Sequence, residues 1–182
     1  PDSTKILDDD GNEVPQGQTG IVYFKQSPIA PFEYYKDPEK TKAAHRGNYF
    51  TLGDIGYLDA EGYLYLTDRQ SNMIISGGVN IYPQETESHL ITHPKVHDVA
   101  VIGVPNDETG EEVKAVVVPA PDSEASPSLA NELIQFCRAQ IAHYKCPRTI
   151  DFVTELPRTE TGKMQKRKLR DRYWQGHQSR LV

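Results

Sequence analysis

The chain is poor in cysteine, in long apolar runs and in positive charge. Cys137 and Cys146 are its only cysteines, too few for a disulfide scaffold, so the sequence favours a reducing, cytoplasmic compartment. No apolar run approaches the roughly 20 residues of a membrane-spanning helix, and we expect no transmembrane segment. The 20 Lys and Arg against 26 Asp and Glu give a net charge of -6, which argues against non-specific nucleic-acid binding.

The remaining composition is that of a globular protein. Hydrophobic residues make up 37% and charged residues 25% of the chain. Its 182 residues are enough for one domain and part of a second. The sequence starts with Pro1 rather than Met, and we therefore expect a fragment of a longer protein.

The first third of the chain predicts a β-rich segment. Apolar stretches at 20–24, 56–58 and 63–66 predict strands. Residues 59–62 (DAEG) join the last two as an acidic, glycine-containing turn. Residues 38–45 predict a short helix.

Residues 69–182 alternate strands and helices in mixed order. We expect helices at 83–93, from Ser126 onward and after Lys163, and strands at 99–104, 113–118 and 150–153. Residues 76–80 (SGGVN) predict a flexible loop. The mixed order indicates an α+β fold rather than a doubly wound parallel sheet.

Residues 157–163 (PRTETGK) carry the most informative local pattern. Pro157 fixes its own φ and Gly162 can adopt a positive φ, so the segment predicts a tight, exposed turn. The turn would present Lys163, whose ammonium suits an anionic oxygen or a phosphate.

Two other clusters favour structural interpretations. His89, His93 and His97 are spaced by four, but Pro94 interrupts the helix and no further ligand completes a metal site. The basic residues from Lys166 to Arg172 could indicate nucleic acid or a targeting signal. A solvated helix face is the favoured interpretation, so we expect neither a metal nor a nucleic-acid partner.

Five motifs stand in one order along the chain: residues 53–57 (GDIGY), 68–69 (DR), 75–83 (ISGGVNIYP), 93–94 (HP) and 157–163. Together they resemble the C-terminal portion of an AMP-forming acyl-CoA synthetase, a member of the adenylate-forming superfamily. Each motif alone is weak, but the ordered set covers nearly the whole chain.

The resemblance implies two domains. Residues 1–67 would be the β-rich end of a large N-terminal adenylating domain, and residues 68–182 its small, mobile, mixed α/β C-terminal domain. The family's phosphate-gripping loop and acyl pocket are not in this sequence, so the resemblance implies an incomplete catalyst. Its substrates would be a carboxylic acid, ATP and CoA, with Mg²⁺ bound mainly by the large domain.

The resemblance also implies roles for individual residues. Lys163 would be the catalytic lysine that neutralises charge in the adenylation transition state. Asp54 would accept hydrogen bonds from the ribose hydroxyls, and Arg69 would lie on the nucleotide side. Asp68 would be the hinge. Asp54 as a turn residue and Arg69 in a surface ion pair are the alternatives.

The glycine motif would serve the thiol substrate. Gly77 and Gly78 would let the pantetheine chain of CoA lie close to the backbone. Asn80 occupies a position where relatives often have a polar or cationic side chain. Val79 and Asn80 depart from the larger residues of relatives, which leaves their contacts open.

Three functions follow from the resemblance. An acyl-CoA ligase is the first, with a fatty or other hydrophobic acid favoured as its substrate. An adenylating enzyme that loads a carrier protein is the second, and a non-catalytic binding or regulatory module is the third. Intact Lys163, Asp54 and Arg69 weigh against the module. Peripheral membrane contact is left open.

Overall fold

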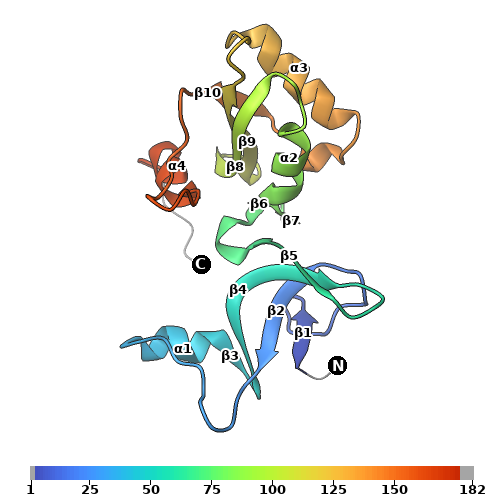
Figure 1. Cartoon of the computed structure of the whole chain (residues 1–182), viewed down its shortest axis with the longest axis vertical. Coiled ribbons are helices and arrows are strands. Elements are labelled where there is room, and N and C mark those ends of the chain that lie inside the picture. Colours follow the sequence, from blue (N-terminus) through green and yellow to red (C-terminus); the bar gives the residue numbers. More distant parts are fainter. Residues whose placement is uncertain (1–2, 177–182) are drawn as a thin grey trace. The chain divides into compact units, whose positions relative to one another are not determined.

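The structure is a computed structural model that describes residues 3–176. The chain forms two compact units, Pro1–Ser71 and Asn72–Val182 (Figure 1). The division falls four residues after the boundary at residue 67 expected from the sequence. The assignment of the units to an adenylating and a mobile domain stays a prediction.

The first unit is one antiparallel sheet with strand order β1-β2-β4-β3, in which β5 also pairs with β4. Its elements are β1 Thr4–Leu7, β2 Gly20–Lys25, α1 Pro38–Ala44, β3 His45–Arg46, β4 Tyr49–Leu58 and β5 Leu64–Arg69. Helix α1 begins where the Asp37 side chain accepts a hydrogen bond from the Lys40 N–H, with Pro38 in its first turn.

The long strand β4 organises this first sheet. It pairs with β2 over Gly20–Lys25 and with β5 beyond Asp54. The acidic turn to β5 is held by Asp59, whose Oδ1 accepts hydrogen bonds from the N–H groups of Glu61 and Tyr63. Gly62 in that turn has a φ of 84°, a conformation that glycine adopts without strain.

The second unit contains a second five-stranded sheet, in which β9 pairs with β6, β8 and β10. The β9–β10 pair is parallel, whereas β9 is antiparallel to β6 and β8. The elements from the end of the first unit onward are η1 Gln70–Asn72, β6 Ile74–Ser76, β7 Val79–Ile81, α2 Pro83–Leu90, β8 Val96–Asn106, β9 Gly110–Pro119, α3 Pro127–Arg138, η2 His143–Lys145, β10 Thr149–Phe152 and α4 Lys166–Tyr173.

Helices cover both faces of this sheet (Figure 1). On one face α2 and α3 pack through Leu90, Leu133 and Cys137, which join a core cluster with β8 and β9. On the other face α4 packs through Leu169 against a second cluster that includes Ile102 and Val116. Because β8 and β9 are buried on both faces, their apolar runs are nearly continuous.

The predicted α+β class is confirmed, and the structure corrects several boundaries. Residues 76–80, expected to be a flexible loop, form the end of β6, the turn and the start of β7 in the β6–β7 hairpin, in which Ser76 pairs with Val79. Helix α2 ends at Leu90 rather than at 93, before Pro94 is reached. No helix among residues 3–176 is both long and apolar enough to cross a membrane.

Candidate functional site

The segment that presents Lys163 is a tight turn closed by its own backbone. Thr159 N–H donates to the Lys163 carbonyl at 2.8 Å, and Gly162 N–H donates to the Thr159 carbonyl at 2.8 Å. The Lys163 N–H in turn donates to the Thr159 hydroxyl at 3.0 Å. Gly162 takes a φ of 83°. The turn therefore holds the Lys163 backbone while its side chain stays exposed.

Arg158 fastens this turn to the sheet. Its Nη1 donates to the Gly162 carbonyl at 2.8 Å, and its Nη2 donates to Asp98 Oδ2 on β8 at 2.7 Å. One guanidinium therefore binds both the Gly162 carbonyl in the turn and a carboxylate on strand β8. The fork of the guanidinium suits two such acceptors at fixed angles.

Helix α4, which follows the turn, is held by a stripe of polar side chains at positions 166, 170 and 174. Lys166 Nζ lies 2.7 Å from Glu87 Oε1 on α2, and Arg170 Nη2 lies 3.4 Å from Glu111 Oε1 on β9. Trp174 Nε1 donates to the Gly103 carbonyl at 3.0 Å. A spacing of four residues places these groups on one helix face.

The prediction of a solvated basic helix is therefore wrong for part of α4. Lys166 is only 13% exposed, and Arg170 binds a carboxylate that is 2% exposed. The prediction holds for Arg167, Lys168 and Arg172, which are exposed. Lys166 and Arg170 are consequently structural cations of this fold.

The glycine motif forms the turn of the β6–β7 hairpin. Gly77 and Gly78 have φ values of 57° and 80°, so side chains at either position would be strained. Both glycines are exposed, and Gly77 N–H donates to the Thr109 carbonyl at 2.9 Å. Asn80 is half-buried on β7 and pairs with Ile75. The bare backbone needed for a close ligand approach is present at the two glycines.

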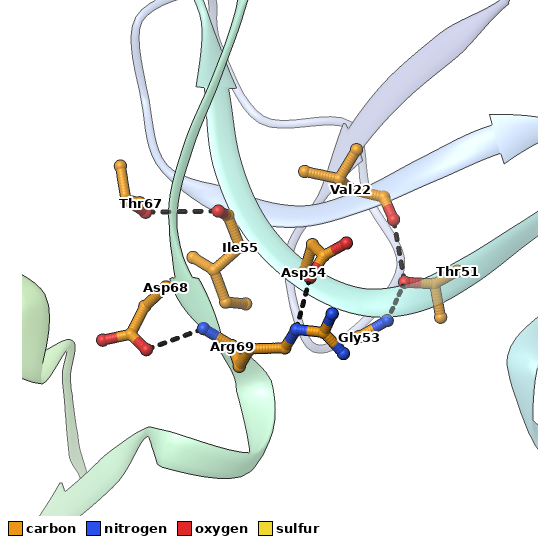
Figure 2. Close-up of polar contacts among 8 residues, drawn as sticks. All are labelled: Val22, Thr51, Gly53, Asp54, Ile55, Thr67, Asp68 and Arg69. Carbon is orange, nitrogen blue, oxygen red and sulfur yellow. Dashed lines mark hydrogen bonds and ion pairs between the residues drawn. The ribbon is translucent and has the colours of Figure 1, made fainter. Parts of the chain in front are cut away.

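Asp54 and Arg69 form an ion pair in the first unit (Figure 2). They face each other across β4 and β5, and Arg69 Nε lies 2.8 Å from Asp54 Oδ1. Asp54 is 15% exposed and Arg69 54% exposed. The other carboxylate oxygen of Asp54 points away from the guanidinium (Figure 2). The two residues predicted to contact the nucleotide are thus neighbours.

Asp68 lies beside this pair at the end of β5. Its Oδ1 accepts a hydrogen bond from the Arg69 N–H at 2.7 Å (Figure 2). Asp68 pairs with Ile55, and the register of β4 and β5 shifts between Ile55 and Gly56. The predicted hinge residue therefore belongs to an irregular end of the strand pair, three residues before the division at Ser71. Its role as the hinge stays a prediction.

Two of the three histidines lie in an aromatic cluster, whereas His97 is exposed on β8. The His89 ring stacks on Phe136 with centroids 4.3 Å apart, and His93 meets the same ring edge-on at 4.8 Å. Within residues 3–176, no group of three or more His, Cys, Asp or Glu side chains is placed to hold a metal ion. His89 and His93 join α2 to α3.

Comparison with known proteins shows what the chain is similar to. Residues 85–163 match the AMP-binding enzyme C-terminal domain, a region that ends at Lys163. An ATP-bound RpMatB-BxBclM chimera has a TM-score of 0.86 at 39% identity over 94% of this chain. ATP-bound MatB from Rhodopseudomonas palustris has a TM-score of 0.84 at 36% identity over the same share. The chain is therefore similar to part of each of these two proteins, and its residues 85–163 match a domain of AMP-binding enzymes.

Two curated proteins are similar to nearly the whole chain. A long-chain-fatty-acid–CoA ligase of Escherichia coli O6:H1 is 41% identical over 92% of this chain. The human mitochondrial acyl-coenzyme A synthetase ACSM4 is 41% identical over 97% of it. The chain spans 29% and 31% of the lengths of these two relatives, and 34% of each of the two solved structures.

Several residues that shape the site escaped the sequence analysis. Arg158 was seen only as part of a turn, and Asp98, Glu87 and Glu111 were not singled out. Two acidic residues at the start of a strongly apolar strand, Glu111 and Glu112, were the available signal for Glu111. A carboxylate is costly to bury without partners, so one inside such a strand indicates a specific contact.

Proposed function

We propose that this chain is the C-terminal part of an ATP-dependent, AMP-forming acyl-CoA ligase. The observation that carries the proposal is the closed turn that presents Lys163 at the end of the matched AMP-binding C-terminal domain. The ligase would first join a carboxylic acid to ATP, forming an acyl-adenylate and pyrophosphate. The thiol of CoA would then attack the acyl carbon and release AMP.

Different residues of this chain would act in the two steps. Lys163 would place a cation beside the phosphate oxygens as charge develops during adenylation, which requires no reorganisation because the turn is already closed. Asp54 would accept hydrogen bonds from the ribose hydroxyls through the carboxylate oxygen that faces away from Arg69. Gly77 and Gly78 would admit the pantetheine chain of CoA against their backbone in the second step.

A fatty or other hydrophobic acid is the proposed acyl substrate. The support is the naming of similar proteins, which include two long-chain-fatty-acid–CoA ligases, from Escherichia coli O6:H1 and from Mycobacterium tuberculosis H37Rv. Mg²⁺, the ion expected with ATP, would be bound mainly by the large N-terminal domain.

Pyrophosphate exchange by the complete enzyme over a panel of acids tests the function. We expect exchange that depends on a fatty acid, followed by thioester formation when CoA is added. The 182-residue chain alone should form no acid-dependent AMP. Exchange with no acid of the panel would overturn the ligase proposal. A thioester formed with an acyl carrier protein but not with CoA would favour the carrier-loading alternative.

A further inference from the structure

Glu111 is a buried carboxylate at the start of β9 that binds two separate segments. Its side chain is 2% exposed. Oε2 accepts a hydrogen bond from the Ile75 N–H at 3.0 Å, and Oε1 lies 3.4 Å from Arg170 Nη2. A buried carboxylate is stable only where such donors replace water.

The two segments that Glu111 joins carry the residues of different reaction steps. Ile75 lies in β6, immediately before the hairpin turn at Gly77 and Gly78. Arg170 lies in α4, two turns after Lys163. The two donors to Glu111 are far apart in sequence, and one side chain binds them both.

Strand β8 is shaped to make room for this carboxylate. A Cβ atom added to Gly103 would lie 2.6 Å from Glu111 Oε2 and 3.0 Å from its Cδ. The Gly103 carbonyl also accepts the hydrogen bond from Trp174 Nε1. The absence of a side chain at Gly103 therefore leaves the space that the carboxylate fills, close to a second attachment of the α4 segment.

We propose that Glu111 is a positioning residue that sets the glycine hairpin and the Lys163–α4 segment in one fixed geometry. The inference rests on the proposed function for its catalytic consequence. In structural terms, loss of the Glu111 carboxylate would loosen both the glycine hairpin and the Lys163–α4 segment. Glu111 acts through Ile75 and Arg170 and contacts no substrate itself.

Glu111→Gln tests the carboxylate with almost no change of shape. A carboxylate has two acceptor oxygens, whereas a carboxamide has one, and its NH₂ group only donates. Since Ile75 N–H and the Arg170 guanidinium both donate, Gln can satisfy only one of these two groups. Gly103→Ala is the second variant, because it displaces the carboxylate without removing its charge.

Amide hydrogen exchange of the complete enzyme tests whether Glu111 links the two segments, and it requires no activity measurement. We expect Glu111→Gln and Gly103→Ala to speed exchange in both 74–81 and 157–174, whereas Arg170→Gln should do so in 157–174 only. Glu112→Gln is the matched control, since Glu112 is the neighbouring half-buried carboxylate and binds Asn106 Nδ2. It should change neither segment.

Kinetic measurements of the two half-reactions test the catalytic consequence. A displacement of about 1 Å can cost up to about 10²-fold in rate, so we expect Glu111→Gln to lower kcat of adenylation about tenfold and to raise the KM for CoA several-fold. Arg170→Gln should lower adenylation and leave the KM for CoA within about twofold. Glu112→Gln should match the wild type in both steps.

Three results would overturn the positioning role. The first is unchanged exchange of either segment in Glu111→Gln, and the second is faster exchange throughout β8 and β9, which would indicate general destabilisation. The third is an unchanged ratio of kcat for adenylation to KM for CoA despite the expected exchange pattern. A wild-type enzyme without any adenylation would instead refute the proposed function, and the exchange pattern would still decide the link made by Glu111.

Discussion

Arg158 binds Asp98 across 60 residues of sequence, at 2.7 Å between Nη2 and Oδ2. The pair connects the turn that presents Lys163 with strand β8. Both partners are partly exposed, at 42% and 25%, and an ion pair of that kind contributes only about 0–1 kcal/mol to stability. Its importance is geometric, because the same guanidinium also holds the Gly162 carbonyl.

Arg158→Gln should therefore impair adenylation more than stability. Loss of both guanidinium contacts frees the turn and misplaces Lys163, for which we expect about a tenfold fall in kcat of pyrophosphate exchange. Thermal unfolding should stay near that of the wild type. Arg167→Gln removes an equally basic, exposed residue from α4 and should be neutral. Equal rates in both variants would show that the Asp98 contact does not position the turn.

Lys163→Ala should separate the two half-reactions. Removal of a group that stabilises charge in a transition state typically costs about 10²–10³-fold in kcat. Adenylation measured by pyrophosphate exchange should fall by that factor, whereas thioester formation from supplied acyl-adenylate should be largely retained. Lys168→Ala, on the exposed face of α4, is the control. An equal loss in both half-reactions would refute the assignment of Lys163 to the first step.

Asp68→Pro tests the hinge. Proline fixes φ near −65°, so a hinge at this position would be locked. If the locked geometry suits the first step, acyl-adenylate should accumulate while transfer to CoA stalls, as followed by single-turnover chromatography. Asp68→Ala also loses the bond to the Arg69 N–H but keeps backbone freedom, and it should turn over. Normal acyl-CoA formation by Asp68→Pro would exclude a hinge at this residue.

The two thiols should be inert in the folded chain. Burial raises the pKa of Cys137 to about 12 and also raises the pKa of Cys146. Since the thiolate is the reactive form, a colorimetric thiol reagent at pH 8 should react slowly with the native protein and rapidly with both cysteines in guanidinium chloride. Fast labelling of either cysteine with unchanged circular dichroism would contradict the buried placement.

The sequence predicted the elements of the second unit better than their ends. The apolar runs at 99–104 and 113–118 marked the central strands, because two-sided burial demands continuous apolar residues. The strands extend to Val96–Asn106 and Gly110–Pro119. Their polar ends are held by the β8–β9 ladder, as in the pairing of Asn106 with Gly110. Local composition does not encode such a partner.

Non-local contacts also explain the errors at the candidate site. Ser76 to Asn80 has a loop composition, yet Ser76 pairs with Gly110 of β9 as well as with Val79. Lys166 and Arg170 read as a solvated face because their carboxylate partners, Glu87 and Glu111, lie far away in sequence. The motifs predicted which residues would meet the substrates, whereas the residues that support them became visible only in three dimensions.

The parallel pairing of β10 with β9 has a consequence for dissection of the molecule. After Pro119 the chain leaves the sheet, passes through α3 and re-enters it at Thr149. A cut in the loop at 120–126 would leave β6 to β9 on one polypeptide, and β10, the Lys163 turn and α4 on the other. If the two halves recovered adenylation when combined, that activity would report reassembly of the sheet, and variants that reassemble could be selected by it.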